Sequence, residues 1–404
     1  MTRTGEAGRR GEKVRSDCWV RVEPKTRGGL KLSVRTKVEA MYGDAVRATC
    51  TKALEALGVK HAAVAVEDFG ALDFVLMARV EAAVKRAGLG EGRACLPEPG
   101  PGFGAKAVRE RFRRSRLYLP GNEPKFFLNA ALHEPDGVIL DLEDSVAPAE
   151  KDAARLLVRN ALRAVDFGSC ERTVRINQGE RGLWDVEAVV PQNVHLLLIP
   201  KVESAEQVRA VDERAEKIRK SSGLKAPVHL MPIIESALGC FHALEIAKAS
   251  PRVVALTIGL EDYTADLGAP RTQEGRESFW ARSVVVNAAR AAGVTPIDTV
   301  FSDVSDMEGL RAACLDAKAL GFEGKGCIHP RQVPVVHEAF APSIDEIERA
   351  RRIVLAFEEA GRQGLGVVAL GSKMIDPPVV KRALRTVSMA EALGLLPEGW
   401  KKES

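Results

Sequence analysis

Two carboxylates that each follow a run of apolar residues are the most informative feature for chemistry. Glu235 directly follows residues 228–234, and Asp262 follows residues 253–258 and a short turn. Unbroken Val, Ile and Leu runs are typical of strands buried on both faces, and a parallel α/β barrel builds its active site where such strands end. Two carboxylates completed by waters are a common way to hold Mg²⁺. We therefore predict a magnesium site at Glu235 and Asp262, the alternative being two acids that cap the helices after them.

Three more acids, Asp141, Glu143 and Asp144, follow the apolar run 137–140. This density of negative charge at one rim is unfavourable unless a cation or hydrogen-bond donors neutralise it. We expect these acids to support the waters around the metal. A solvated acidic loop before a helix is the other interpretation.

Arg175 lies inside the apolar run 173–176, where a charge must be paired or used. Its planar guanidinium suits a carboxylate or an oxygen that develops negative charge. We predict a substrate-binding or catalytic role for Arg175, with a core ion pair as the alternative.

The remaining candidates have weaker patterns. Arg116 opens the run 117–119, and the loop behind it contains Lys125 at a loop-to-helix junction that suits a phosphate-like anion. Asp376 precedes two prolines, which is typical of an ordinary helix N-cap, although an acid is available there. No G-x-G-x-x-G or G-K-S/T motif follows a strand. Three histidines lack partners at ligand spacing and are interpreted as structural: His61, His133 and His229. A fourth, His329, lies near the predicted rim of the barrel and could have either role.

Alternating apolar runs and amphipathic segments must position these residues. Eight runs predict strands separated by helical patterns such as residues 205–220 and 279–292, which favours a (β/α)₈ barrel over an open sheet. The predicted strands are residues 117–119, 137–140, 173–176, 194–199, 228–234, 253–258, 296–300 and 324–328. We assign the barrel to residues 111–341.

The flanking regions have different patterns. Residues 1–90 alternate as half-exposed strands with two helical stretches, which predicts a small α+β domain whose first dozen residues form a frayed tail. Residues 91–110 are rich in Gly and Pro, as in a linker. Residues 342–404 predict a C-terminal helical lid, with a helix over 345–360, a Gly-rich joint over 361–371 and a helix from Pro378.

Composition limits the function classes. The chain has 404 residues, 46% hydrophobic and 28% charged, as in an ordinary enzyme. A net charge of +4 and a basic cluster over 109–116 without interleaved aromatics do not favour nucleic acid. Seven scattered cysteines without C-x-x-C indicate neither a disulfide framework nor a zinc site, and no run is long enough for a membrane span. We expect a cytoplasmic protein.

From residue 116 to about residue 395, the chain resembles the citrate lyase beta-subunit family of aldolase/citrate lyase barrels. The motifs that carry the resemblance are RSRLYLPGNEPKF, DGVILDLEDSVAPAEKDAAR, VRIN, LIPKVES, PIIESALG, IGLEDY, DTVFSD, GFEGKGCIHPRQ and GVVALGSKMIDPPVV. The resemblance implies a barrel whose C-terminal extension covers a neighbouring subunit's site in a trimer. It also matches residues to roles: Glu235 and Asp262 to Mg²⁺ ligands, Arg175 to the substrate arginine, Asp376 to the lid acid, and Arg116 and Lys125 to basic positions near a CoA-type group.

The first domain resembles the gamma chain of citrate lyase, an acyl carrier protein. The matching segments are SDCWVRV, EAMYGDA and EDFGALDF. In that family a serine two residues before an aspartate bears a CoA-like (phosphoribosyl-dephospho-CoA) arm. Here the residue two before Asp17 is Arg15, and Ser16 is the serine available for the arm.

The resemblance implies cleavage of a citryl thioester to oxaloacetate and an acetyl thioester. A thioester carbonyl accepts the electrons of the broken carbon–carbon bond, and Asp376 protonates the resulting carbon. Two alternatives stay open: an acyl-CoA lyase acting on malyl- or citramalyl-CoA with the first domain as a docking module, and a non-catalytic scaffold. An alpha-type CoA-transferase subunit is the implied partner.

Overall fold

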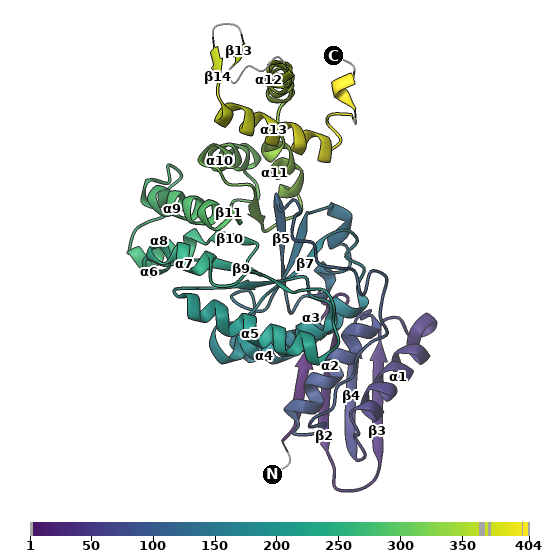
Figure 1. Cartoon of the computed structure of the whole chain (residues 1–404). Coiled ribbons are helices and arrows are strands. Elements are labelled where there is room, and N and C mark those ends of the chain that lie inside the picture. The colour runs from purple at the N-terminus through teal and green to yellow at the C-terminus, as the bar shows by residue number, and fades with distance from the viewer. Residues whose placement is uncertain (1–2, 363–367, 371–372, 398, 403–404) are drawn as a thin grey trace. The chain divides into compact units, whose positions relative to one another are not determined.

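The middle part of the chain folds into a closed barrel of parallel strands (Figure 1). The structure is a computed structural model that describes residues 3–362, 368–370, 373–397 and 399–402. The strands run in the order β10-β11-β12-β5-β6-β7-β8-β9, with parallel pairing throughout. Their bounds are β5 (Ser115–Pro120), β6 (Gly137–Asp141), β7 (Glu171–Arg175), β8 (Leu196–Ile199), β9 (His229–Ile234), β10 (Ala255–Ile258), β11 (Thr295–Val300) and β12 (Lys325–Cys327). The predicted (β/α)₈ barrel is confirmed.

Helices follow the strands around the barrel (Figure 1). The helix α5 (Ala205–Ser221) shows how the sequence starts them: the side chains of Ser204 and Gln207 form a capping box that accepts hydrogen bonds from the backbone N–H groups of residues 207 and 204. The helices are α3 (Lys151–Ala164), α4 (Gly179–Val189), α5 (Ala205–Ser221), α6 (Ala237–Phe241), α7 (Ala243–Ala247), α8 (Leu260–Leu267), α9 (Arg276–Ala292), α10 (Met307–Leu320) and α11 (Gln332–Phe340). Apolar side chains of several strands pack inside the barrel, among them Ile139, Leu196, Leu198, Met231, Ile233 and Ile297.

The N-terminal domain is a separate four-stranded sheet with two helices. The strand order is β1-β2-β4-β3, with β3 parallel to β4 and the other pairs antiparallel. The elements are β1 (Gly5–Gly8), β2 (Cys18–Pro24), β3 (Leu30–Thr36), α1 (Glu39–Ala56), β4 (Ala62–Asp68) and α2 (Asp73–Arg86).

The strand β1 corrects the prediction of a frayed tail over the first dozen residues. Its sequence, GEAG, has low strand propensity, so the pattern gave no signal. Residue 5 must be glycine, because a Cβ there would lie 2.0 Å from the carbonyl oxygen of Ala83 in α2. The backbone of β1 therefore packs directly against the backbone of α2, an approach that only glycine permits.

The chain divides into two units, Met1–Val333 and Pro334–Ser404, which we describe separately. In the second unit, α12 (Ile344–Arg362) and α13 (Pro377–Ala392) share an apolar core with Trp400, which lies in a short 3₁₀ segment. The predicted Gly-rich joint over 361–371 is partly wrong, since β13 (Val368–Leu370) pairs with β14 (Lys373–Ile375) as an antiparallel hairpin. The rest of that joint, residues 363–367 and 371, lies outside the described residues. Three-residue strands are too short to give a periodic signal.

Two general properties bear on function. All seven cysteines are free and buried. In the described part of the chain, no helix combines the length and the apolar character needed to cross a membrane.

Candidate active site

Glu235 and Asp262 meet at the carboxyl end of the barrel. Glu235 directly follows β9, and Asp262 lies in the first turn of α8 after the neighbouring strand β10. Glu235 is buried and its carboxyl hydrogen-bonds to Asp262, which is partly exposed. Burial and the adjacent Asp262 together raise the pKa of Glu235 well above its usual range. The cap of α6 is Ser236, whose hydroxyl accepts from Gly239, so Glu235 does not serve as a helix cap.

The local backbone leaves room for this pair. At Gly259, a Cβ would lie 2.7 Å from Oε2 of Glu235, so any side chain at this position would displace the carboxylate. Gly259 precedes α8 and therefore sets both the approach of Glu235 and the start of the helix that carries Asp262. The segment Ile-Gly-Leu-Glu-Asp thus supplies both the acid, Asp262, and the glycine that leaves room for the carboxylate of Glu235.

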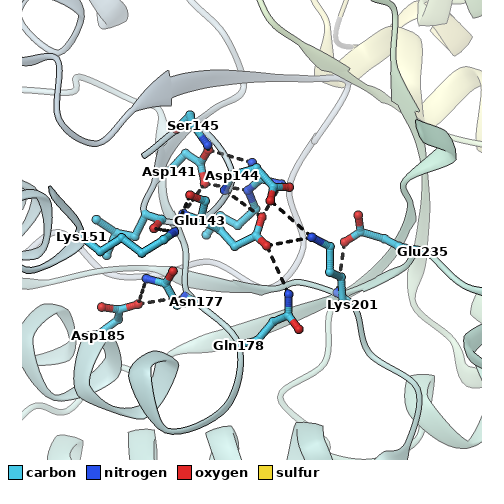
Figure 2. A network of polar contacts seen from close by, with 12 residues as sticks. Asp141, Glu143, Asp144, Ser145, Lys151, Asn177, Gln178, Asp185, Lys201 and Glu235 are labelled. Atoms are coloured by element: carbon cyan, nitrogen blue, oxygen red, sulfur yellow. Dashed lines mark hydrogen bonds and ion pairs between the residues drawn. The ribbon is translucent and has the colours of Figure 1, made fainter. Parts of the chain in front are cut away.

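Lys201 completes the acidic cluster and was assigned no role from sequence. Its ammonium Nζ lies 3.1 Å from Glu143 and 3.3 Å from Asp144, and its backbone N–H donates to Glu235 at 3.1 Å (Figure 2). The same ammonium lies 3.5 Å from Asp262. Its φ is +51°, a left-handed conformation that is uncommon outside glycine. Burial lowers the pKa of Lys201, but the surrounding carboxylates outweigh burial and raise it. A cation two residues after β8 was the signal that sequence reasoning could have used.

Arg175, at the end of β7, is held by the acids of the preceding strand. Its Nε and Nη2 each donate at 2.7 Å to one oxygen of Asp141, and its Nη1 lies 3.2 Å from Glu143. Burial acts to raise the pKa of Asp141, but the hydrogen bonds and positive charge of Arg175 outweigh burial, so the pKa of that carboxyl is below its usual value. The core ion pair that sequence left open is therefore present, and Arg175 also lines the cavity at the barrel mouth.

The acidic run is neutralised by donors, as its charge density requires. Asp141 accepts backbone N–H groups from Glu143 and Ser145, while Lys151 donates to the carbonyls of Leu142 and Glu143 (Figure 2). Burial raises the pKa of Glu143, and hydrogen bonding to Glu143 and the nearby cations lowers that of Asp144. The run is thus part of the site and not a freely solvated loop.

One cavity of about 340 Å³ joins these groups. Its lining includes Arg116, Tyr118, Asp141, Arg175, Glu235 and Asp262. Arg116 is 3% exposed, and its guanidinium lies against Met231 and Thr257; its predicted place near a CoA-type group stays a prediction. Lys125 is exposed in a 3₁₀ segment after β5, 3.4 Å from Glu123, and does not line this cavity.

Asp376 and Ser16 belong to parts of the chain outside the barrel strands. Asp376 belongs to the second unit, where it caps α13 by accepting from Val379 at 3.2 Å. Ser16 has a φ of +55°, is half-buried and donates its backbone N–H to Phe69 in the N-terminal domain. Their proposed roles as acid and as attachment point stay predictions.

The residues at the barrel mouth fit a divalent cation. Among the described residues, no group of three or more His, Cys, Asp or Glu side chains is arranged so that it could hold a metal ion, so protein ligands alone would not saturate a metal here. Two adjoining carboxylates with a cavity beside them are the set that Mg²⁺ accepts when water or substrate oxygens complete the shell. Glu235 and Asp262 would hold the ion, and the space beside Gly259 admits the carboxylate.

Comparison with known proteins identifies two segments. Residues 114–330 match the family model described as HpcH/HpaI aldolase/citrate lyase, and residues 10–87 match that of the malonate decarboxylase delta subunit. The chain is 40% identical over 286 residues to the citrate lyase subunit beta of Leuconostoc mesenteroides subsp. cremoris, covering 70% of this chain and 95% of that protein. It is 37% identical over 305 residues to an L-malyl-CoA/beta-methylmalyl-CoA lyase of Cereibacter sphaeroides, covering 70% and 96%.

The chain is also similar to solved structures. The CitE protein of Mycobacterium tuberculosis, crystallised with magnesium, acetoacetate and coenzyme A, is 34% identical, with a TM-score of 0.58 over 70% of this chain and 99% of that chain. The same protein with magnesium and pyruvate gives a TM-score of 0.52 at 32% identity, over 71% and 99%.

Proposed function

We propose that this chain, which belongs to the HpcH/HpaI aldolase/citrate lyase family, is a Mg²⁺-dependent lyase that cleaves a citryl thioester to oxaloacetate and an acetyl thioester. It is an enzyme of the carbon–carbon lyase class, as its relatives are named. The observation that carries the proposal is the pairing of Glu235 with Asp262 in a cavity that also contains Arg175.

The chemistry requires a hydroxyl that loses its proton, a carbon–carbon bond that breaks and an electron sink. Mg²⁺ held by Glu235 and Asp262 would supply Lewis-acid polarisation of the substrate's hydroxyl and carboxylate oxygens. Arg175, fixed in orientation by Asp141, donates hydrogen bonds to oxygen that gains charge. The electrons of the broken bond pass into the thioester as an enolate. Asp376 in its protonated form would donate a proton to the enolate carbon, which gives the acetyl thioester, and the proton that the hydroxyl releases would restore the acid.

We propose that the N-terminal domain presents the thioester to the barrel. Asp17 forms two 2.9 Å hydrogen bonds with Arg79, and Arg79 also donates to the carbonyl of Asn122 at 3.2 Å. Asn122 lies in the loop after β5, two residues beyond Pro120, which lines the cavity. This chain of contacts supports an arm on Ser16 that starts beside the catalytic rim of the same chain.

The closest rival keeps the barrel chemistry but uses a free acyl-CoA, with the N-terminal domain as a docking module. Arg15 at the position of the expected serine favours this rival. Its substrates would be malyl- or citramalyl-CoA, since relatives with those names match over 70% of the chain. In either case we propose a homotrimer or higher oligomer, with an alpha-type CoA-transferase as a further partner.

Two experiments separate these proposals. The purified chain is assayed with citryl-, malyl- and citramalyl-CoA, each with Mg²⁺ and with EDTA; EDTA-sensitive cleavage of citryl-CoA in preference to the others supports the proposal. Cleavage of none of the three would contradict the lyase assignment. Intact mass after co-expression with arm-attaching enzymes, compared with Ser16→Ala, distinguishes a carrier from a docking module.

A further inference from the structure

Arg116 is a buried cation that crosses the interior of the barrel. It is the second residue of β5, and it lines the cavity together with Tyr118 and Pro120 on the same face of that strand. Its Nη1 lies 2.9 Å from the sulfur of Met231 on β9, and its Nη2 donates to the hydroxyl of Thr257 on β10 at 3.2 Å. Because the strand begins at residue 115, Arg116 forms the floor of the cavity, below the acids at the mouth.

The guanidinium has no carboxylate partner among the described residues. Its contacts are a thioether and a hydroxyl, and its Nε is buried without a hydrogen-bond partner. Neighbouring buried cations are paired: Arg113 with Glu171, and Lys325 and Arg282 with Asp298. A buried charge without a counter-charge is costly, and burial accordingly lowers the pKa of Arg116.

An anion that enters the cavity would remove this cost. The cation site at Glu235 and Asp262 suits the hydroxyl and adjacent carboxylate of the substrate, which leaves the floor for a second carboxylate. Among 3-hydroxyacyl thioesters, those that release a 2-oxo dicarboxylic acid carry this group. Those that release a 2-oxo monocarboxylic acid do not.

We propose that Arg116 is the specificity-determining residue of the cavity and binds a second substrate carboxylate, so that the barrel selects a dicarboxylic 2-oxo acid half. This inference rests on the proposed function and names its substrate class. A planar guanidinium binds a carboxylate through two parallel hydrogen bonds, which distinguishes it from the point charge of a lysine.

Oxaloacetate and pyruvate form a matched pair of probes, since they differ by one carboxylate. Calorimetric titration of the full chain in Mg²⁺ should show oxaloacetate binding about 10- to 100-fold more tightly than pyruvate, as expected for a charged hydrogen-bonded pair. In Arg116→Met the ratio should fall to within about threefold, with pyruvate affinity retained. Arg116→Lys keeps the charge and should keep part of the preference.

Each outcome decides the inference. An unchanged preference in Arg116→Met overturns it, and so does equal loss of both ligands in a variant whose melting temperature and circular dichroism match the wild type. If Arg116→Met does not fold, Arg116→Lys still tests the role, because loss of only the oxaloacetate affinity supports it and no loss opposes it. If the wild type cleaves no thioester, the proposed function fails, while the binding ratio still tests Arg116 on its own.

Discussion

The ammonium of Lys201 lies 3.5 Å from the carboxylate of Asp262, inside the acidic cluster where a divalent cation would bind. The same ammonium contacts Glu143 and Asp144, so it compensates the charge of the cluster without a metal. A side chain that neutralises the acids also repels a second cation placed beside it.

We therefore predict that Lys201→Met binds Mg²⁺ about tenfold more tightly than the wild type, because one positive charge beside the ion is removed. Without Mg²⁺ the same variant should melt at a lower temperature, since three carboxylates lose the one cation that contacts all of them. Calorimetric titration with MgCl₂ and thermal melts with EDTA measure both effects. Lys201→Arg is the matched control, and weaker Mg²⁺ binding in Lys201→Met would contradict the prediction.

Glu235→Gln tests the metal site with minimal change of shape. The amide oxygen can still accept from the backbone N–H of Lys201, so the fold should persist. We expect the variant to lose the rise in melting temperature that Mg²⁺ gives the wild type, and turnover to fall by roughly 10³-fold. An undiminished Mg²⁺ shift in Glu235→Gln would place the ion elsewhere.

The barrel and the positions of its acids could be predicted from sequence because buried parallel strands give continuous apolar runs. Glu235, Asp262 and Arg175 each stand at the end of such a run, and strand order brings them together. Lys201 was missed because its conformation is left-handed and its partners come from three other segments. Its place two residues after an apolar run could have marked Lys201 as a candidate, but its ion-pair partners depend on tertiary distances that no local pattern contains.

The orientation of the Arg116 side chain also could not be predicted from the sequence. The family resemblance matched Arg116 to a basic position near a CoA-type group, while the residue pattern showed only that it opens an apolar run. In the structure it points inward, because side chains alternate along β5 and residues 116, 118 and 120 share one face. The register of β5, which depends on where the strand begins, therefore decides that the side chain of Arg116 lines the cavity.

His229 gives a prediction on acid stability. It is the first residue of β9, is buried, and neither ring nitrogen has a hydrogen-bond partner among the described residues. Burial lowers its pKa to about 4, from an ordinary value of 6.5. Between these values the unfolded chain binds a proton that the folded chain does not, so the free energy of unfolding falls as pH decreases.

The loss from His229 alone should reach about 3 kcal/mol by pH 4, at about 1.4 kcal/mol per pH unit. His229→Leu should be at least as stable as the wild type at pH 7 and lose less stability between pH 6.5 and 4.5. Urea unfolding at several pH values measures this difference. The exposed His133→Gln is the control, and identical pH profiles for wild type and His229→Leu would refute the assignment.

The N-terminal domain is joined to the barrel through a buried ion pair between Glu81 and Arg159. Glu81 of α2 is fully buried and accepts from both Nη atoms of Arg159 in α3, at 3.0 and 2.8 Å, and from the backbone of Cys95 at 2.7 Å. Arg159→Met leaves this carboxylate with Lys85 as its remaining charged partner. We expect a loss of roughly 3–5 kcal/mol in the free energy of unfolding, because the cost of burying Glu81 is no longer offset.

Limited proteolysis of Arg159→Met should then cut within residues 96–104, which connect the two parts. The double variant Glu81→Gln/Arg159→Met should recover much of the stability, since it removes the buried charge; a single variant as stable and protease-resistant as the wild type would mean that other contacts hold the domain.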